Sequence, residues 1–157
     1  MSSERHRDGR SIHDFFGEAL IVCPKCAHVA LSRLNDPLST DLFAARRLTC
    51  DHCGQTRSWE RGAIRRQRRR APALDAHFDL PLWLQARCCS ELLWAYNTEH
   101  LAFLEAFVRA RLRERRRSAE YGWSNQALMS RLPSWLKSRK NRDEVLACID
   151  RLRKTLA

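Results

Sequence analysis

Two pairs of cysteines lie in the first third of the chain, and two residues separate the members of each pair. Cys23 and Cys26 form the stretch CPKC, and Cys50 and Cys53 form the stretch CDHC. One such pair could be half of a metal site or a thioredoxin-like redox motif. A redox motif needs a single pair at the start of a helix, so it leaves the second pair unexplained. Four thiolates suit one tetrahedral ion, and the spacing therefore favours a metal site.

We predict one Zn²⁺ ion per chain at these four cysteines. A site closed by four thiolates has no position for water or substrate, so the expected role of the ion is structural. Iron in a rubredoxin-like site is the alternative. A rubredoxin usually repeats a glycine after both pairs and is acidic, whereas Ala27 follows the first pair here and the chain is basic. His28 and His52 adjoin the ligands and are expected to face solvent.

Short stretches on both sides of each pair indicate the elements that position the cysteines. Four of them read as strands: residues 19–22, 28–31, 46–49 and 55–59. Gly54 suits the last position of a turn, which often needs positive φ. Residues 35–41 are rich in turn-forming types and connect the two halves. We therefore expect a zinc ribbon over residues 19–62, in which two β-hairpins share one ion.

The net charge of the chain is +11 at pH 7, and the excess lies in three clusters, at residues 65–70, 109–117 and 137–142. Basic clusters attract phosphate backbones and other polyanions, and the attraction weakens with salt. They carry no base specificity alone. The candidate nucleic-acid-binding residues are Arg65, Arg66, Arg68, Arg69, Arg70, Arg113, Arg115, Arg116, Arg117, Lys137, Arg139 and Lys140.

The second half of the chain predicts a hairpin followed by helices. Residues 82–85 and 91–96 are aromatic-rich and could pair across residues 86–90. Asn97 offers an N-cap to a long helix, whose apolar stripe we expect to contain Leu101, Leu104, Val108 and Leu112. The helix ends in an arginine cluster, and cations there complement the helix dipole.

Three shorter helical segments are expected after residue 124. Residues 125–132 read as a helix, and the chain restarts after Pro133 over residues 134–138. Asn141 followed three residues later by Glu144 is a capping-box pattern that opens the last helix. The hairpin and helices together could bury three aromatic side chains, those of Trp83, Trp94 and Trp135.

The remaining cysteines raise the question of a second metal site. Cys88 and Cys89 could bind an ion together with His77 and His100, but adjacent cysteines rarely chelate in the way that a C-x2-C pair does. A tight turn or a reactive pair of thiols is therefore the expected role of Cys88 and Cys89. Cys148 reads as a small core residue on the last helix.

These patterns predict an α+β chain in four parts. They are a mobile tail over residues 1–18, the zinc ribbon over 19–62, a basic linker over 63–73 and a hairpin plus helical module over 74–157. No apolar run approaches the roughly 20 residues of a membrane span, and the N-terminus has no apolar signal-peptide core. We therefore expect a cytoplasmic protein, in which seven cysteines argue for bound metal or free thiols rather than disulfides.

Two stretches behind the cysteine pairs carry a resemblance to a known group of proteins. They are LPLWLQARCCSELLWAYNTEHLAFLEAFV and LMSRLPSWLKSRKNRDEVLACIDRL. With the N-terminal ribbon they resemble small bacterial zinc-ribbon-containing proteins, labelled after the ribbon of a general transcription factor, from about Ile21 to the C-terminus. The resemblance implies that the four cysteines of the two pairs hold zinc, and it implies no established activity. In that group a glycine often follows the adjacent cysteines, where this chain has Ser90.

The leading hypothesis is a zinc-dependent nucleic-acid-binding protein, associated with transcription or DNA metabolism, whose arginine clusters contact the phosphate backbone of DNA or RNA. Bases could be read by the turns that carry the cysteines or by Arg46, Arg47 and Arg57. The alternative is a protein-interaction adaptor, in which the ribbon docks on a larger complex and the arginines meet an acidic partner surface. An enzyme is not expected, because the chain has no phosphate loop, no His-Glu metal helix and no nucleophile–base pair. We expect neither a membrane nor a small-molecule substrate as a partner.

Overall fold

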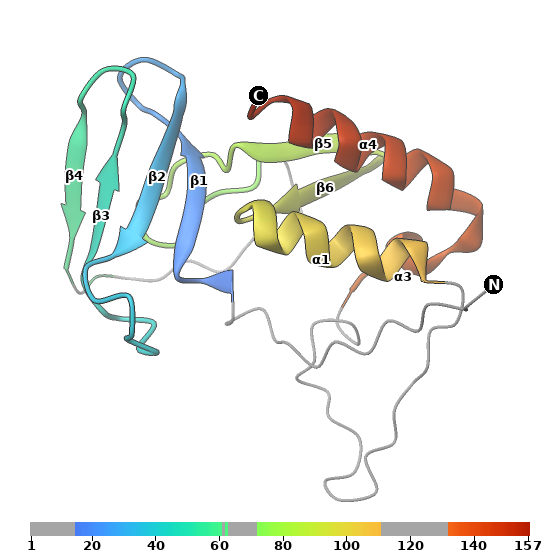
Figure 1. The fold of residues 1–157 in the computed structure, drawn as a ribbon, viewed down its shortest axis with the longest axis horizontal. Helices are drawn as coiled ribbons and strands as arrows, with labels where there is room; N and C mark the ends of the chain where they lie inside the picture. The colour runs from blue at the N-terminus through green and yellow to red at the C-terminus, as the bar shows by residue number, and fades with distance from the viewer. Residues whose placement is uncertain (1–14, 61, 63–71, 111–131) are drawn as a thin grey trace, which may run out of the picture.

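The computed structural model describes residues 15–60, 62, 72–110 and 132–157. Residues 63–71 of the predicted basic linker and residues 125–131 of the helix predicted over 125–132 lie outside the described residues, as does nearly all of the predicted tail. The described part is a mixed α+β structure in which antiparallel strands and helices stand side by side (Figure 1). None of its helices is long and apolar enough to cross a bilayer.

The first half forms one antiparallel sheet of four strands in the order β1-β2-β3-β4. The strands are β1 (Glu18–Val22), β2 (Val29–Leu34), β3 (Arg46–Thr49) and β4 (Thr56–Trp59). They match the four predicted strands to within a few residues. Two hairpins were expected, and the structure joins them, because β2 also pairs with β3 from Leu31 opposite Thr49 to Leu34 opposite Arg46.

Alternation along the strands gives this sheet one buried face. Ala19 and Ile21 on β1 are buried, as are Ala30 and Ser32 on β2. Leu48 continues this face on β3 and is completely buried. Successive residues point to opposite sides of a strand, so the buried face carries every second residue, including the polar Ser32.

The second half begins with the hairpin of β5 (Leu84–Cys88) and β6 (Glu91–Ala95). Its strands are offset from the predicted ones, and a turn of two residues replaces the predicted connection of five. Cys89 and Ser90 occupy this turn with φ of 53° and 62°. Positive φ at both central residues is the signature of a type I′ turn, which matches the twist of an antiparallel hairpin.

Helix α1 (Thr98–Arg109) follows β6 directly, and its N-cap is as predicted. The side chain of Asn97 accepts a hydrogen bond from the His100 backbone N–H at 2.8 Å. The stripe residues Leu101, Leu104 and Val108 are buried, whereas Leu112 lies outside the described residues. A polar cap and a continuous apolar face both depend on residues close together in the chain. The sequence was therefore enough to predict this helix.

The chain ends with α3 (Ser134–Lys137), a 3-10 turn η2 (Arg139–Asn141) and α4 (Arg142–Lys154). The last helix begins where expected, but the predicted capping box is wrong. Asn141 makes no side-chain cap and donates through Nδ2 to the Trp135 carbonyl at 2.8 Å. Glu144 accepts from the backbone N–H of Cys89 at 2.9 Å. The side chains of Asn141 and Glu144, which the capping-box pattern assigns to the start of α4, therefore form hydrogen bonds with other partners instead.

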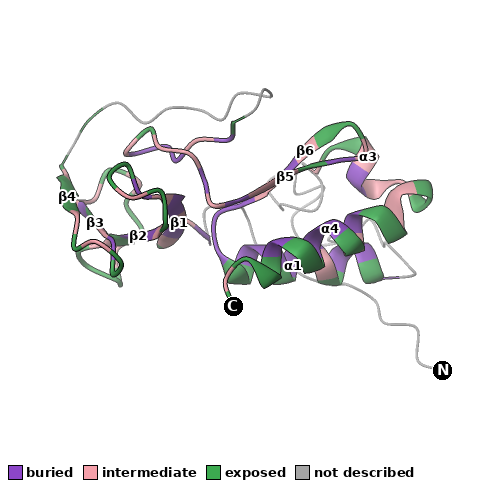
Figure 2. Ribbon diagram, turned by 90° about the horizontal axis from the view of Figure 1, so that it is seen from above, coloured by how far each residue is buried: buried purple, intermediate pink, exposed green. Residues whose placement is uncertain are grey.

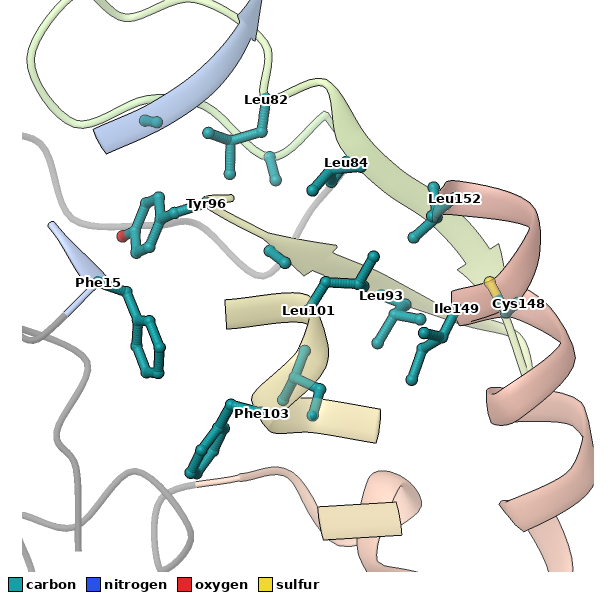
Figure 3. Close-up of a cluster of buried hydrophobic side chains, with 14 of the residues drawn as sticks. Phe15, Leu82, Leu84, Leu93, Tyr96, Leu101, Phe103, Cys148, Ile149 and Leu152 are labelled. Atoms are coloured by element: carbon teal, nitrogen blue, oxygen red, sulfur yellow. The ribbon is translucent and has the colours of Figure 1, made fainter. Parts of the chain in front are cut away.

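Helices α1 and α4 pack on the β5–β6 hairpin and bury the core between them (Figures 1 and 2). Figure 3 shows its centre, where Leu93 of β6 and Leu101 of α1 meet Ile149 of α4. The prediction that three tryptophans are buried together is wrong. Each is only half-buried and packs against the edge of the core: Trp83, Trp94 and Trp135.

Strand β1 connects the four-stranded sheet to the second half. The Leu20 N–H donates to the Tyr96 carbonyl at 2.7 Å, and the Trp83 N–H donates to the Leu20 carbonyl at 2.9 Å. Asn97 Nδ2 donates to the Glu18 carbonyl at 2.8 Å. The hydrophobic cluster includes residues from both halves. The division into modules at residue 74 stays a prediction, and the backbone on either side of it is hydrogen-bonded together.

Candidate metal centre

The four cysteines of the two C-x2-C pairs lie at the turns of the β1–β2 and β3–β4 hairpins. The two turns have the same hydrogen bonds. Cys23 N–H donates to the His28 carbonyl at 2.8 Å, and Cys50 N–H donates to the Gln55 carbonyl at 2.9 Å. The Cys23 carbonyl accepts from the Ala27 N–H at 2.9 Å, and the Cys50 carbonyl accepts from the Gly54 N–H at 2.8 Å. The hairpins therefore present their sulfurs in equivalent positions.

Positive φ closes each turn, as the sequence predicted for Gly54. Its φ is 74°, and Ala27 at the equivalent position has a φ of 61°. Alanine adopts this conformation at a cost of roughly 1 kcal/mol, because its Cβ approaches the backbone. The first turn therefore keeps the shape of the second without the glycine.

The sulfurs of the two hairpins meet at the distances expected for ligands of one ion. Cys23 Sγ lies 3.6 Å from Cys53 Sγ, and Cys26 Sγ lies 3.6 Å from Cys50 Sγ. All four ligand atoms lie within 4.8 Å of one another. A tetrahedral ion with metal–sulfur bonds of about 2.3 Å separates its sulfurs by about 3.8 Å. The cluster could therefore hold a metal ion.

The protons in the cluster are distributed unevenly. Burial raises the pKa of Cys23, but the backbone N–H groups of Cys26 and Lys25 and the neighbouring thiols outweigh it and lower the pKa to about 6. The backbone N–H of His28 lowers the pKa of Cys26, whereas burial and the neighbouring thiols raise it to about 12. One sulfur is thus a thiolate near neutral pH while an adjacent one keeps its proton. Thiolates are the form that binds metal.

Four sulfurs complete a tetrahedron and leave no ligand position for water. Cys23 and Cys50 are buried, and Cys26 and Cys53 are half-buried. This arrangement suits an ion that holds two hairpins together, and it does not suit activation of water or substrate.

His28 and His52 are exposed, as predicted, and they stack on each other across the two turns. Their ring centroids are 3.5 Å apart with an interplanar angle of 11°. His28 Nδ1 lies 3.1 Å from the Cys26 carbonyl oxygen. The sequence indicated their exposure, but only the pairing of the hairpins brings the two rings together.

Arg46 is not available to read bases, and this part of the prediction is wrong. It is only 2% exposed, with its Nε donating to the Ser32 hydroxyl at 3.2 Å and its Nη1 donating to the Phe16 carbonyl at 2.6 Å. Arg47 and Arg57 are exposed. Alternation on β3 explains the difference, because Arg46 shares its face with the fully buried Leu48.

Most of the candidate nucleic-acid-binding residues lie outside the described part of the chain. These are Arg65, Arg66, Arg68, Arg69, Arg70, Arg113, Arg115, Arg116 and Arg117. Arg139 and Lys140 are exposed on η2, and Lys137 is half-buried at the end of α3. The structure therefore exposes two cations of the third basic cluster.

The ligands considered for a second metal site do not come together. His77 Nε2 lies 3.1 Å from the Leu42 carbonyl oxygen, and His100 Nδ1 accepts from the Tyr96 N–H at 3.1 Å. Cys88 and Cys89 instead meet Glu144 of α4. The prediction of a tight turn at the adjacent cysteines is confirmed.

Glu144 is the residue of this region that the sequence did not reveal. Its carboxylate is 55 residues from Cys89, and the local pattern assigned it to a helix cap. Burial raises the pKa of Cys88, with the Cys89 and Cys148 thiols adding to the effect. Burial also raises the pKa of Cys89. Both thiols are therefore protonated at neutral pH, which argues against a nucleophilic role.

No protein-family model, no curated protein and no solved structure matches this chain.

Proposed function

We propose that this chain is a zinc-dependent nucleic-acid-binding protein, in which an N-terminal zinc ribbon holds one structural Zn²⁺ and arginine clusters contact a phosphate backbone. Zn²⁺ is favoured over iron because the chain is basic and lacks the glycine after its first cysteine pair. The sulfur separations of 3.6 Å support a tetrahedral ion.

The distribution of charge is the observation that carries the proposal. The described residues contain 14 Lys or Arg and 13 Asp or Glu, a net charge of +1. The remaining residues therefore hold +10 of the total of +11. Residues 63–71 contribute +5 and residues 111–131 contribute +4. Two short segments with this density of arginine suit a polyanion better than a patterned protein surface.

The exposed face of the four-stranded sheet offers a further cationic position. Glu18, Arg33, Arg47 and Ser58 lie opposite one another across the four strands. Arg33 is neutralised by Glu18, with its Nε 3.1 Å from the carboxylate. Arg47 has no ion-pair partner among the described residues, so its charge is available to a phosphate.

Binding of a labelled duplex and a labelled single strand across a salt series tests the proposal. Each phosphate contact contributes about 0.9 to the slope of log affinity against log salt on duplex DNA. Replacing the arginines of residues 65–70 with glutamine removes five charges. The slope should then fall by about 4 to 5 if all five contact phosphate. The matched control replaces the same arginines with lysine and should keep the slope. Binding that does not depend on salt contradicts the proposal.

A specific observation favours the adaptor as a second candidate. Leu38 is 89% exposed and Phe43 is 53% exposed, both in the loop between β2 and β3. Asp36 and Asp41 accept backbone hydrogen bonds from Leu38 and Phe43 at 3.0 and 2.9 Å. The loop is thus ordered by local hydrogen bonds and presents two apolar side chains to solvent. Exposed apolar side chains on an ordered loop suit a protein partner.

The two candidates are distinguished by one comparison. A stoichiometric protein partner that survives nuclease treatment and is lost in the Leu38→Ser, Phe43→Ser variant favours the adaptor. Loss of all partners on nuclease treatment, together with salt-dependent binding to nucleic acid, favours the first candidate.

A further inference from the structure

A second group of thiols lies at the turn of the β5–β6 hairpin and is separate from the four cysteines of the two C-x2-C pairs. The tight turn of the β5–β6 hairpin meets the first turns of α4, so that Cys88, Cys89 and Glu144 come together. Their ligand atoms all lie within 4.8 Å of one another. The Cys88 and Cys89 sulfurs are 3.7 Å apart. Residues from two elements that are 55 positions apart thus converge on one point.

The distance between the Cys88 and Cys89 sulfurs fits two ligands of one ion as well as the sulfur distances in the four-cysteine cluster do. The two contacts between the N-terminal hairpins are 3.6 Å each, and a tetrahedral ion with thiolate ligands requires about 3.8 Å. Adjacent cysteines rarely reach this geometry in an extended chain, because their side chains point to opposite faces of a strand. Here Cys89 has left the strand and has a φ of 53°. The turn therefore brings the Cys89 thiol to the side on which Cys88 lies.

Cys148 adds a third thiol to the group. It lies one helical turn after Glu144, and residues four apart share a face of a helix. Its sulfur lies 4.0 Å from the carbonyl oxygen of Arg87, the residue before Cys88. Figure 3 shows Cys148 on α4 beside the hairpin strand that α4 packs against. It also contributes to the raised pKa of Cys88. Three soft sulfur donors and one carboxylate are thereby available at the junction of β5 and α4.

We propose that Cys88, Cys89 and Glu144, with Cys148 as the adjacent third thiol, form a second site for a thiophilic divalent ion of the Zn²⁺ or Cd²⁺ class. Each thiol releases its proton to solvent when its sulfur bonds to the ion. Glu144 Oε1 accepts a hydrogen bond from the Cys89 N–H, and a carboxylate has further lone pairs with which to bind an ion. Cys88 and Cys148 are buried, and Cys89 is half-buried and gives the ion access from solvent.

The site would join the hairpin turn to α4 through metal–ligand bonds. Among the described residues, one side-chain hydrogen bond joins the turn residues Cys89 and Ser90 to the helix, from the Cys89 N–H to Glu144. The proposal is independent of the nucleic-acid-binding function, since it uses none of the residues assigned to that function or to the first metal site.

Cadmium-113 NMR of the full-length protein, kept reduced and loaded with Cd²⁺, tests the proposal. Two resonances are expected, and the one from the second site should lie upfield, because it has fewer sulfur ligands and one oxygen. Cys88→Ser with Cys89→Ser should remove the second resonance alone, and Glu144→Gln should shift it. Ser90→Gly, in the same turn but without a change of thiol, should keep both.

Cysteine alkylation of the unsubstituted protein provides a second test, which does not depend on whether the variants fold. Cd²⁺ at ten times its Kd leaves about a tenth of the sites free, so alkylation of Cys88 and Cys89 by iodoacetamide should slow about tenfold. Peptide mass spectrometry separates these residues from the first site. A single cadmium resonance, together with alkylation rates that do not change on addition of Cd²⁺, would overturn the proposal. A Cys88–Cys89 disulfide that persists in the presence of reductant would also overturn it.

Discussion

The guanidinium of Arg46 donates a hydrogen bond to the Ser32 hydroxyl at 3.2 Å within the buried face of the four-stranded sheet. Burial lowers the pKa of Arg46, and Asp75 counteracts this through its charge. Asp75 is itself only 2% exposed and accepts backbone hydrogen bonds from His77 at 3.1 Å and Phe78 at 2.6 Å. Arg46 on β3 and Asp75 are thus buried groups of opposite charge, and Asp75 shapes the turn before β5 through its backbone hydrogen bonds.

Arg46→Ala should lower the free energy of unfolding by about 2 to 4 kcal/mol, because it leaves a cavity and removes the buried donor to the Ser32 hydroxyl and the Phe16 carbonyl. Urea unfolding measures the change. Arg47→Ala is the matched control, since Arg47 is exposed on the same strand, and it should alter stability by less than about 0.5 kcal/mol. Equal costs for the two variants would contradict the role given to Arg46.

Removal of metal should unfold the two N-terminal hairpin turns before the helices. The four cysteines lie in these turns and could hold one ion between them, whereas α1 and α4 pack against each other and against the β5–β6 hairpin. Hydrogen exchange with and without a strong chelator is the measurement. The amides of Cys23 and Cys50 should lose protection, the buried turns of α1 should keep most of theirs, and added Zn²⁺ should restore the difference.

Protection of the Cys23 and Cys50 amides that does not respond to chelator would show that the hairpin turns are stable without an ion. Cys50→Ser provides an independent check, because it removes one ligand and leaves the strand sequences intact. It should reproduce the effect of the chelator without responding to added Zn²⁺.

Ser90→Gly should stabilise the protein by about 0.5 to 1 kcal/mol. Ser90 has a φ of 62°, a conformation that costs a residue with a Cβ roughly 1 to 2 kcal/mol and costs glycine little. Part of the gain is lost to the greater freedom of glycine in the unfolded chain. Thermal unfolding of the variant should show a higher Tm.

The matched control for this substitution is Ser138→Gly. Ser138 has a φ of −74°, which any residue adopts, so glycine there should destabilise by about 0.5 to 1 kcal/mol. A gain at residue 138, or a loss at residue 90, would contradict the type I′ turn.

Stability should fall as the pH drops below about 6.5, in part because of His77. Burial lowers the pKa of His77, the charge of Arg46 lowers it further, and the Leu42 carbonyl and Asp75 oppose the shift. The folded state then keeps His77 neutral while the unfolded state binds a proton. Stability due to His77 is present above the unfolded pKa and is lost on acidification, by up to about 1.4 kcal/mol per pH unit.

Urea unfolding at a series of pH values, compared with the His77→Gln variant, isolates this contribution. Glutamine does not titrate and can still donate to the Leu42 carbonyl. The variant should show a smaller loss between pH 6.5 and 5, and identical slopes would rule out His77 as the cause.

Features that depend on neighbours in the chain were predictable from the sequence. The C-x2-C spacing, the flanking strands and the Asn97 cap depend on a few consecutive residues, and the structure shows each of them. The capping box at Asn141 failed although its pattern is also local. Asn141 instead donates to the Trp135 carbonyl, and Glu144 accepts from the Cys89 N–H. These hydrogen bonds outside the helix replace the ones expected within the cap.

The sequence by itself therefore determined the four candidate metal ligands, the order of strands and helices, and the excess of positive charge. Only the tertiary structure decided that Arg46 is buried while Arg47 is exposed, that His28 stacks on His52, and that Glu144 meets Cys89. These relationships join residues that are far apart in the chain, or depend on which face of a strand turns inward. These contacts form only when the hairpins, the sheet and α4 have packed together. They therefore cannot be predicted from patterns of neighbouring residues.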